Sequence, residues 1–323
     1  MIKITLPDES IREYENKVTV GEVTKDISEG LYRSALGAVV NGKVMGYRDP
    51  ITEDSSFRVV KFEDEEGKEI FWHTTSHVMA AAIKKLWPET KFAIGPAIAD
   101  GFYYDMDLAH RFVPEDLEKI EKEMLAIAKS DQKLERIEIS KDEAIKMFEK
   151  EGQDYKVELI NDLDDGQLIT LYKMGDIFTD LCAGPHLEST KKIKAVKLKT
   201  IAGAYWRGDS NRQMLQRIYG ISFEKAKQLE EWKELQKEIE RRDHRKIGKE
   251  MDLFAFHEEG PGFPFFHPNG MILMNELLDW WRGVLDERGY GEIKTPLIMN
   301  EELWHRSGHW DHYKENMYFT KID

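Results

Sequence analysis

Residues 73–105, HTTSHVMAAAIKKLWPETKFAIGPAIADGFYYD, predict a helix followed by a β-hairpin. Positions three or four apart share one helical face, and the run from Met79 to Ala82 consists of good helix formers. We expect the helix from Trp72 to Trp87, because Pro88 cannot continue it. After it, Gly95-Pro96 and Asp100-Gly101 bracket alternating apolar residues, as a hairpin requires. A helix beside a hairpin places this region in the mixed α+β class.

The segment before this stretch has the pattern of a small separate unit at residues 1–61. Apolar residues alternate with polar ones near the start, as in a strand, and then recur at helical spacing between Val20 and Leu36. Short strands are expected around 39–44 and 57–60, after turn-forming residues. This order is that of a β-grasp fold. The acidic residues 63–67 are interpreted as a linker in a solvated loop.

The segments after the hairpin alternate between helices and strands. An amphipathic helix is predicted from Pro114 to Lys129, and Ser140 with Glu143 forms a capping box for the next helix. A long charged helix, expected over 222–246, would act as a connector. Beyond it we expect a helix over 271–288 and a strand over 292–299, which Pro296 interrupts as at a sheet edge or interface.

Length and composition limit the possible classes of protein. The chain has 323 residues, 41% apolar and 33% charged, which suits two domains and a small third and excludes disordered and fibrous proteins. No apolar run approaches the roughly 18 to 20 residues of a membrane span. The single cysteine, Cys182, fits a reducing compartment, so we expect a cytoplasmic protein. The net charge of −14 means that a polyanion must bind to a local basic cluster.

Two short motifs place metal-binding and acid–base side chains together. His73 and His77 lie four apart on the predicted helix, so both project from one face. In DLCAGPH, residues 180–186, Asp180 and Cys182 share one face of an extended segment. Gly184-Pro185 then breaks the strand and lets His186 turn back towards them.

These residues admit more than one interpretation. His73, His77, Cys182 and His186 offer three imidazoles and a thiolate, a set that can hold zinc. Alternatively, a histidine acts as general base on water while the other groups orient an ester. A nucleophilic thiol is less favoured, because the local sequence lacks a cysteine-hydrolase motif. The histidine pair by itself also fits two partly buried structural histidines.

The remaining candidate functional residues are lysines. Lys156, in DYKVEL, is placed on a short strand, where it is either an exposed cation or a group that stabilises a phosphate or an oxyanion. Five further lysines crowd into nine residues and are candidates for contact with a phosphate backbone. They are Lys191, Lys192, Lys194, Lys197 and Lys199.

Five blocks of the sequence are similar to those of bacterial threonyl-tRNA synthetases, in the same order. Besides 73–105 and 180–186, they are TIAGAYWRGDSNRQMLQRIYG at 200–220, RRDHRKIGKEMDLF at 241–254 and SGHWDHYKENMY at 307–318. The resemblance implies a multidomain α+β architecture in four parts. These are a ubiquitin-like TGS domain of β-grasp fold at 1–61, an editing domain of mixed α+β fold at 62–224, a linker helix at 225–242, and the start of a class II catalytic domain, a partial antiparallel sheet, at 243–323.

The resemblance also implies a chemical task. Serine lacks one methyl group of threonine, a difference that one binding site penalises by only about 1–3 kcal/mol, so a second, hydrolytic site is needed. It implies that His73 and Lys156 position or activate water, together with the ribose hydroxyls of the tRNA. His77, Asp180, Cys182 and His186 would orient the seryl group and exclude threonine. It further implies that this pocket is free of metal.

Pro296 matches the proline of class II motif 1, which builds the dimer interface in this family. The resemblance implies a homodimeric enzyme that ligates threonine to tRNA(Thr) with ATP, Mg²⁺ and one zinc per subunit, and that hydrolyses mischarged Ser-tRNA(Thr). The later motifs and the zinc ligands are expected beyond Asp323, so we expect this portion alone to hold no cofactor, to retain only the hydrolytic activity and to have no membrane partner. A noncatalytic RNA-binding module is the alternative from another class.

Overall fold

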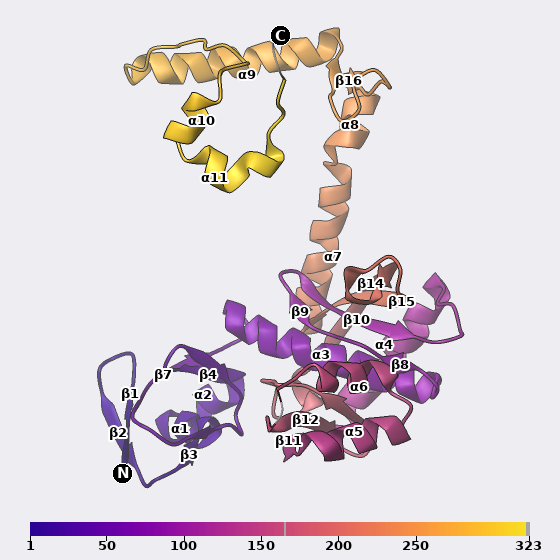
Figure 1. Ribbon diagram of the computed structural model, residues 1–323. Helices are drawn as coiled ribbons and strands as arrows, with labels where there is room; N and C mark the ends of the chain where they lie inside the picture. The colour runs from indigo at the N-terminus through magenta and orange to yellow at the C-terminus, as the bar shows by residue number, and fades with distance from the viewer. Residues whose placement is uncertain (165, 321–323) are drawn as a thin grey trace. The chain divides into compact units, whose positions relative to one another are not determined.

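The computed structural model describes residues 1–164 and 166–320. It divides into two compact units, Met1–Lys237 and Glu238–Asp323, and their boundary falls within helix α7 (Ala226–Arg241). Figure 1 shows the elements of each unit. Both helices and sheets occur throughout the first unit, so the predicted α+β class is confirmed.

The first 61 residues form a five-stranded sheet in the order β2-β1-β7-β4-β5. Its strands are β1 (Ile2–Thr5), β2 (Ile11–Tyr14), β4 (Gly37–Val40), β5 (Lys43–Met45) and β7 (Ser55–Val60), and β3 (Val18–Thr19) pairs with β6 (Pro50–Ile51). The single helix expected between Val20 and Leu36 is instead two, α1 (Val20–Ile27) and α2 (Glu29–Ser34). Ser28 separates them because its side chain caps the start of α2.

Helix α3 (Glu65–Leu86) is central to the first unit and longer than expected. It ends before Pro88 as predicted, but it begins inside the acidic stretch that was interpreted as a linker. Glu65 and Glu66 occupy its first turn, where the helix dipole favours carboxylates. The residues from Thr74 to Ile83 are all buried, so the middle of this helix is part of the core.

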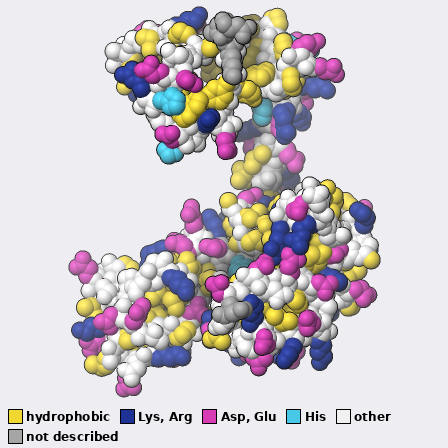
Figure 2. Space-filling view, in the orientation of Figure 1, with side chains coloured by type: hydrophobic (Ala, Val, Ile, Leu, Met, Phe, Trp, Pro, Cys, Tyr) yellow, Lys and Arg dark blue, Asp and Glu magenta, His cyan; other side chains and the backbone are white. Residues whose placement is uncertain are grey.

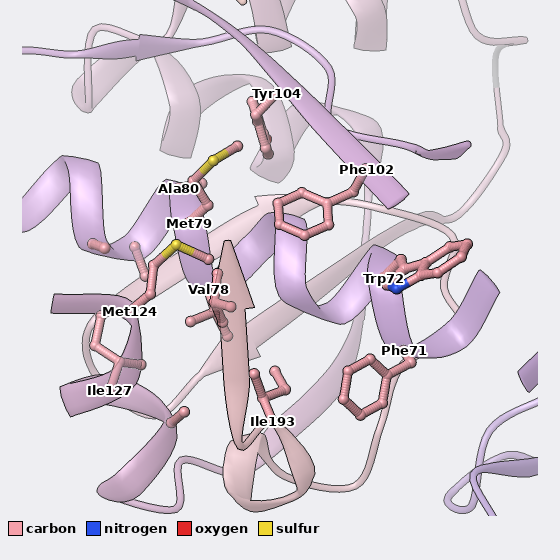
Figure 3. Close-up of a cluster of buried hydrophobic side chains, with 14 of the residues drawn as sticks. Phe71, Trp72, Val78, Met79, Ala80, Phe102, Tyr104, Met124, Ile127 and Ile193 are labelled. Carbon is pink, nitrogen blue, oxygen red and sulfur yellow. The ribbon is translucent and has the colours of Figure 1, made fainter. Parts of the chain in front are cut away.

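A sheet with order β14-β15-β10-β8 packs against α3 and α4 (Pro114–Lys129). Its strands are β8 (Lys91–Phe92), β10 (Gly101–Asp107), β14 (Ala195–Tyr205) and β15 (Met214–Phe223), with β9 (Ala97–Ile98) paired to β10. The β9–β10 pairing confirms the predicted hairpin. Figure 3 shows the core between these layers, where Val78 and Met79 of α3 lie near Met124 and Ile127 of α4.

A third sheet, β11-β12-β13, carries two helices against it. The strands are β11 (Leu134–Ile139), β12 (Ile169–Met174) and β13 (Phe178–Leu181), and the helices are α5 (Lys141–Lys150) and α6 (Asp154–Asn161). The capping box of Ser140 and Glu143 is confirmed at the start of α5. The placement of Lys156 on a strand is wrong, because this residue lies in α6.

The chain from β15 onward corrects two expectations. The connector helix does not begin at Ser222, which is in β15. It also stops at Arg241, and a separate helix, α8 (His244–Glu250), follows the cap residue Asp243. The strand expected over 292–299 is wrong, since that segment has no regular structure. Pro296 has no N–H to donate and Leu297 is fully exposed, and no strand of the described chain pairs with the segment, although Glu292 forms an ion pair with Arg282.

The other elements of the second unit are short except for one helix. They are β16 (Phe254–Ala255), β17 (Phe265–Phe266), α9 (Pro268–Glu287), α10 (Glu302–Arg306) and α11 (His309–Tyr313). Large apolar side chains of α9 are exposed, including Trp280 and Trp281, and Figure 2 shows hydrophobic surface on this unit. Among the described residues, no helix combines the length and apolarity needed to cross a membrane.

Candidate active site

Two elements bring the predicted polar residues together. Helix α3 carries His73 and His77 one turn apart, with ring centroids 5.1 Å from each other. Strand β13 carries the buried Asp180, and the chain after it turns at Gly184, which has a positive φ of 73°. A side chain at Gly184 would also collide with Tyr172, whose hydroxyl lies 2.3 Å from an ideal Cβ. The turn brings His186 back towards Cys182, whose Sγ lies 3.2 Å from its Nε2, and it also places His186 against α3.

The three imidazoles and the thiol form one contact cluster. The ring of His186 lies 4.3 Å from that of His73 and 4.4 Å from that of His77. Cys182 Sγ lies 3.3 Å from Nε2 of His73 and 3.2 Å from Nε2 of His186. His77 and His186 are buried, whereas His73 and Cys182 are partly exposed. Solvent therefore reaches the cluster on the side of His73 and Cys182.

A buried ion pair adjoins this cluster. Lys156 Nζ lies 2.5 Å from Asp180 Oδ1, and both residues are at most 3% exposed. Tyr104, on β10, donates a short hydrogen bond to Asp180 Oδ2 and accepts one of 3.1 Å from Lys156. His77 Nε2 lies 3.6 Å from Asp180 Oδ2, which joins the pair to the histidines. The six predicted residues thus meet at one place, from α3, α6 and the β13 segment.

Burial keeps the cluster neutral at pH 7, apart from the ion pair. It lowers the pKa of His73 to about 4 and that of His77 to about 3, and it lowers the pKa of His186 well below the ordinary value. It also raises the pKa of the Cys182 thiol to about 12. Burial acts to raise the pKa of Asp180 too, but the Lys156 ammonium and its other partners outweigh this and hold it below its usual value. A thiol this weakly acidic is a poor nucleophile.

Sequence reasoning missed three residues that hold the cluster. Tyr104 bonds to both members of the ion pair. Thr74 Oγ1 lies 3.2 Å from Nδ1 of His186 and accepts a hydrogen bond of 2.9 Å from the backbone N–H of Leu187. The ring of Tyr172 lies 4.4 Å from that of His186. Only Thr74 had a sequence signal, its place inside the HTTSH motif beside His73.

Two protein families match parts of this chain. The family described as the threonyl and alanyl tRNA synthetase second additional domain matches residues 169–219, which include Asp180, Cys182 and His186. The TGS domain family matches residues 2–61. The whole chain is 62% identical to the threonine–tRNA ligase of Finegoldia magna, 59% to that of Clostridioides difficile and 56% to that of Clostridium tetani. Over its whole length, the chain is similar to threonine–tRNA ligases.

All of this chain aligns with these three threonine–tRNA ligases, but it covers only 51%, 50% and 50% of their respective lengths. It thus spans about half the length of the curated relatives that it matches. The matched TGS segment comprises β1 to β7, and the match to the second additional domain comprises β12 to β14 and the first part of β15.

The five lysines that are candidates for phosphate contact do not form one unpaired face. Lys191, Lys197 and Lys199 pair with Asp131, Glu121 and Asp100 respectively. Lys192 donates to the backbone carbonyls of Arg33 and Ala35, at 2.8 and 2.7 Å. Lys194 is exposed and has no ion-pair partner within the described chain.

Lys194 lines a groove of about 920 Å³ between α2 and the segment after β13. Six basic and three acidic side chains line it, which makes it locally positive on an acidic chain. The basic residues are Arg33, Lys61, Lys191, Lys192, Lys194 and Lys225.

Proposed function

We propose that this chain carries the hydrolytic site that removes serine from mischarged Ser-tRNA(Thr). The observation that carries the proposal is the convergence of His73, Cys182 and His186 beside the buried pair of Lys156 and Asp180. Such a site offers neutral imidazoles for water and a fixed cation for developing negative charge. The match of residues 169–219 to a domain shared by threonyl and alanyl synthetases supports the same assignment.

Hydrolysis of the seryl ester needs a water held against the carbonyl carbon, an acceptor for its proton and a donor for the oxyanion. His73 is the partly exposed imidazole, and its lowered pKa keeps a nitrogen lone pair free at neutral pH. Lys156 has three N–H donors, of which Asp180 and Tyr104 engage two. The third stabilises the oxyanion or orients the water, and the ribose hydroxyls of the tRNA assist His73.

Selection against threonine follows from crowding. His77, Cys182 and His186 lie within hydrogen-bond or ring-contact distance of one another or of His73, so the seryl group enters a space with fixed walls. Asp180 fixes His77 and Lys156 and orients the amino group of serine. An added methyl group would need these walls to move, which costs typically 1–3 kcal/mol when a packed site is overfilled.

The tRNA is the proposed partner, and the basic groove is its binding surface on this chain. Lys194 and Arg33 lie on the groove and are exposed, so they are available to phosphates. Lys191, Lys197 and Lys199 remain candidates whose carboxylate partners compete with phosphate.

For the whole protein the proposal is a cytoplasmic threonine–tRNA ligase. It would join threonine to tRNA(Thr) with ATP, Mg²⁺ and one zinc per subunit, in a homodimer to whose interface Pro296 contributes. The identity of 62% to a threonine–tRNA ligase over all 323 residues supports this.

The test of the hydrolytic site is a comparison of Ser-tRNA(Thr) and Thr-tRNA(Thr) hydrolysis by the wild type and by His73→Ala. We expect the wild type to prefer Ser-tRNA(Thr), and His73→Ala to lower kcat by about 10²-fold or more, as for loss of a general base. His244→Ala, an exposed histidine of α8, is the control and should match the wild type.

A paired change in the groove separates binding from chemistry in the same assay. Arg33→Gln with Lys194→Gln should raise KM and leave kcat unchanged, because these residues contact only phosphate in the proposal. Equal hydrolysis of both substrates, unaffected by His73→Ala, would refute the hydrolytic assignment. Salt-dependent tRNA binding without turnover would favour the noncatalytic RNA-binding module.

The geometry also favours a second candidate, a zinc-dependent hydrolase. The donor atoms of His73, His77, Cys182 and His186 all lie within 4.8 Å of one another. Tetrahedral zinc with such ligands separates them by about 3.3–3.8 Å, and the two sulfur–nitrogen distances of 3.2 and 3.3 Å are close to this. The residues therefore fit zinc, which would supply a metal-activated water.

Metal analysis decides between the two candidates. We expect the purified protein to hold less than stoichiometric zinc and to hydrolyse Ser-tRNA(Thr) equally well after chelation. One zinc per chain that is lost in Cys182→Ala, together with activity that chelation removes, would establish the zinc-dependent candidate instead. His257→Ala, a histidine outside the cluster, serves as the control for unspecific loss of metal.

A further inference from the structure

The backbone of the TGS segment touches the backbone of the loop that carries His186. A Cβ atom built at Gly46 would lie 3.0 Å from the carbonyl oxygen of His186 and 3.4 Å from Cβ of Pro185. The first distance is too short for an ordinary side-chain contact, so the neighbour would have to shift. Glycine lets the two backbones approach this closely without such a shift.

The turn that presents Gly46 is held firmly by its own segment. The backbone N–H of Gly46 donates to Asp49 Oδ2 at 2.8 Å, and the backbone N–H of Asp49 donates to the carbonyl of Gly46 at 3.0 Å. The Tyr47 carbonyl accepts from Gly21 at 2.9 Å, and the Tyr47 hydroxyl donates to the carbonyls of Tyr32 and Ala35. A displacement at Gly46 therefore cannot be absorbed by the turn and passes to the loop.

Two further contacts fasten the same loop region to the TGS segment. The Tyr32 hydroxyl donates to Glu188 at 3.1 Å, two residues after His186. The Lys192 ammonium donates to two carbonyls at the end of α2, where a helix favours cations. The loop is thus fixed from outside by the TGS segment and from inside by Thr74 of α3.

We propose that Gly46 is a positioning residue for the hydrolytic site, and that the TGS segment forms the outer support which holds His186 against Cys182. This rests on the proposed function only for its effect on hydrolysis. The contact itself is a matter of geometry: the His186 ring has Cys182 on one nitrogen and Thr74 on the other, and its backbone abuts Gly46. A small outward shift of that backbone separates the imidazole from the thiol.

The experiment uses the single thiol of the chain as a reporter. Gly46→Ala and Gly46→Val are compared with wild type for the rate at which iodoacetamide alkylates Cys182, and for His186 ring signals in NMR spectra. We expect alkylation to accelerate several-fold in Gly46→Ala and further in Gly46→Val, with a shift of the His186 signal. In the hydrolysis assay, kcat should fall by about 10-fold while KM is retained, as expected for a small misplacement of a pocket group.

Gly30→Ala is the matched control, because it makes the same change in the same segment, where the nearest atom to a new Cβ is the Ser28 hydroxyl at 3.5 Å. It should leave alkylation, the His186 signal and kcat as in wild type. If Gly46→Val does not fold, thermal unfolding will show it, and Gly46→Ala carries the test. Unchanged alkylation and an unchanged His186 signal in folded Gly46→Ala would overturn the proposal. Accelerated alkylation in a protein whose wild type hydrolyses no Ser-tRNA would uphold it and refute the proposed function instead.

Discussion

Lys156→Met should destabilise the first unit by about 3–5 kcal/mol, because it leaves the Asp180 carboxylate buried without its counter-ion. The pair has no access to solvent that could compensate, since Asp180 is 2% and Lys156 3% exposed. Tyr104 and His77 remain as neighbours, but neither carries a full positive charge at pH 7. The change in the free energy of unfolding can be measured by urea denaturation followed by circular dichroism.

Lys91→Met is the control for this prediction, since Lys91 also lies 2.5 Å from a carboxylate, that of Asp154, but on the surface. Its loss should cost at most about 1 kcal/mol, as for exposed ion pairs. The double change Lys156→Met with Asp180→Leu should recover most of the stability, because no unpaired charge remains. It should not recover hydrolysis of Ser-tRNA(Thr). A cost for Lys156→Met as small as that of Lys91→Met would show that the buried pair is not formed.

The metal-free protein should lose stability steeply as the pH falls below about 6.5, the ordinary histidine value. The folded site keeps three histidines neutral, with the pKa of His73 lowered to about 4 and that of His77 to about 3, while the unfolded chain protonates them all. The unfolded state therefore binds more protons, and stability falls as pH falls. Each histidine contributes at most about 1.4 kcal/mol per pH unit, so three contribute about 4.

The charged groups near these histidines do not reverse the predicted loss of stability at low pH. Asp180 attracts protons to His73 and His77, but burial dominates and lowers both pKa values. The measurement is the urea midpoint between pH 7.5 and 4.5. His77→Gln should reduce the slope by about 1.4 kcal/mol per pH unit, whereas His244→Gln, at an exposed position, should not change it. A slope that His77→Gln leaves intact would mean that His77 is charged in the folded protein.

The histidine cluster could be predicted from sequence because its parts follow local rules. A spacing of four places His73 and His77 on one helical face, and Gly184 forces the turn that returns His186. The meeting of these two segments is a long-range event, which only resemblance to a family supplied. Tyr104 was missed because its pattern in β10 is that of any core strand residue.

The wrong prediction of a strand at Lys156 arose because the segment is short. Tyr155, Val157 and Leu159 alternate with polar residues, which is the period of a strand. In the folded chain Lys156 and Ile160 are the buried residues, four apart on α6, while Tyr155 and Leu159 pack near Trp206. Eight residues are too few for the two periods to be told apart. The Gly46 contact had no local signal at all, since its partner lies 140 positions further along the chain.

The cluster of three histidines and Cys182 draws on residues from His73 to His186, so it cannot exist in a nascent chain that has not yet left the ribosome as far as the segment after β13. Helix α3 emerges first, with its two imidazoles on a surface that is not yet covered. Because distant pairings form late in folding, these rings are open to stray metal ions and solvent during synthesis. The last segment to arrive, DLCAGPH, supplies both the thiol and the third ring, and so completes the cluster in a single step of assembly.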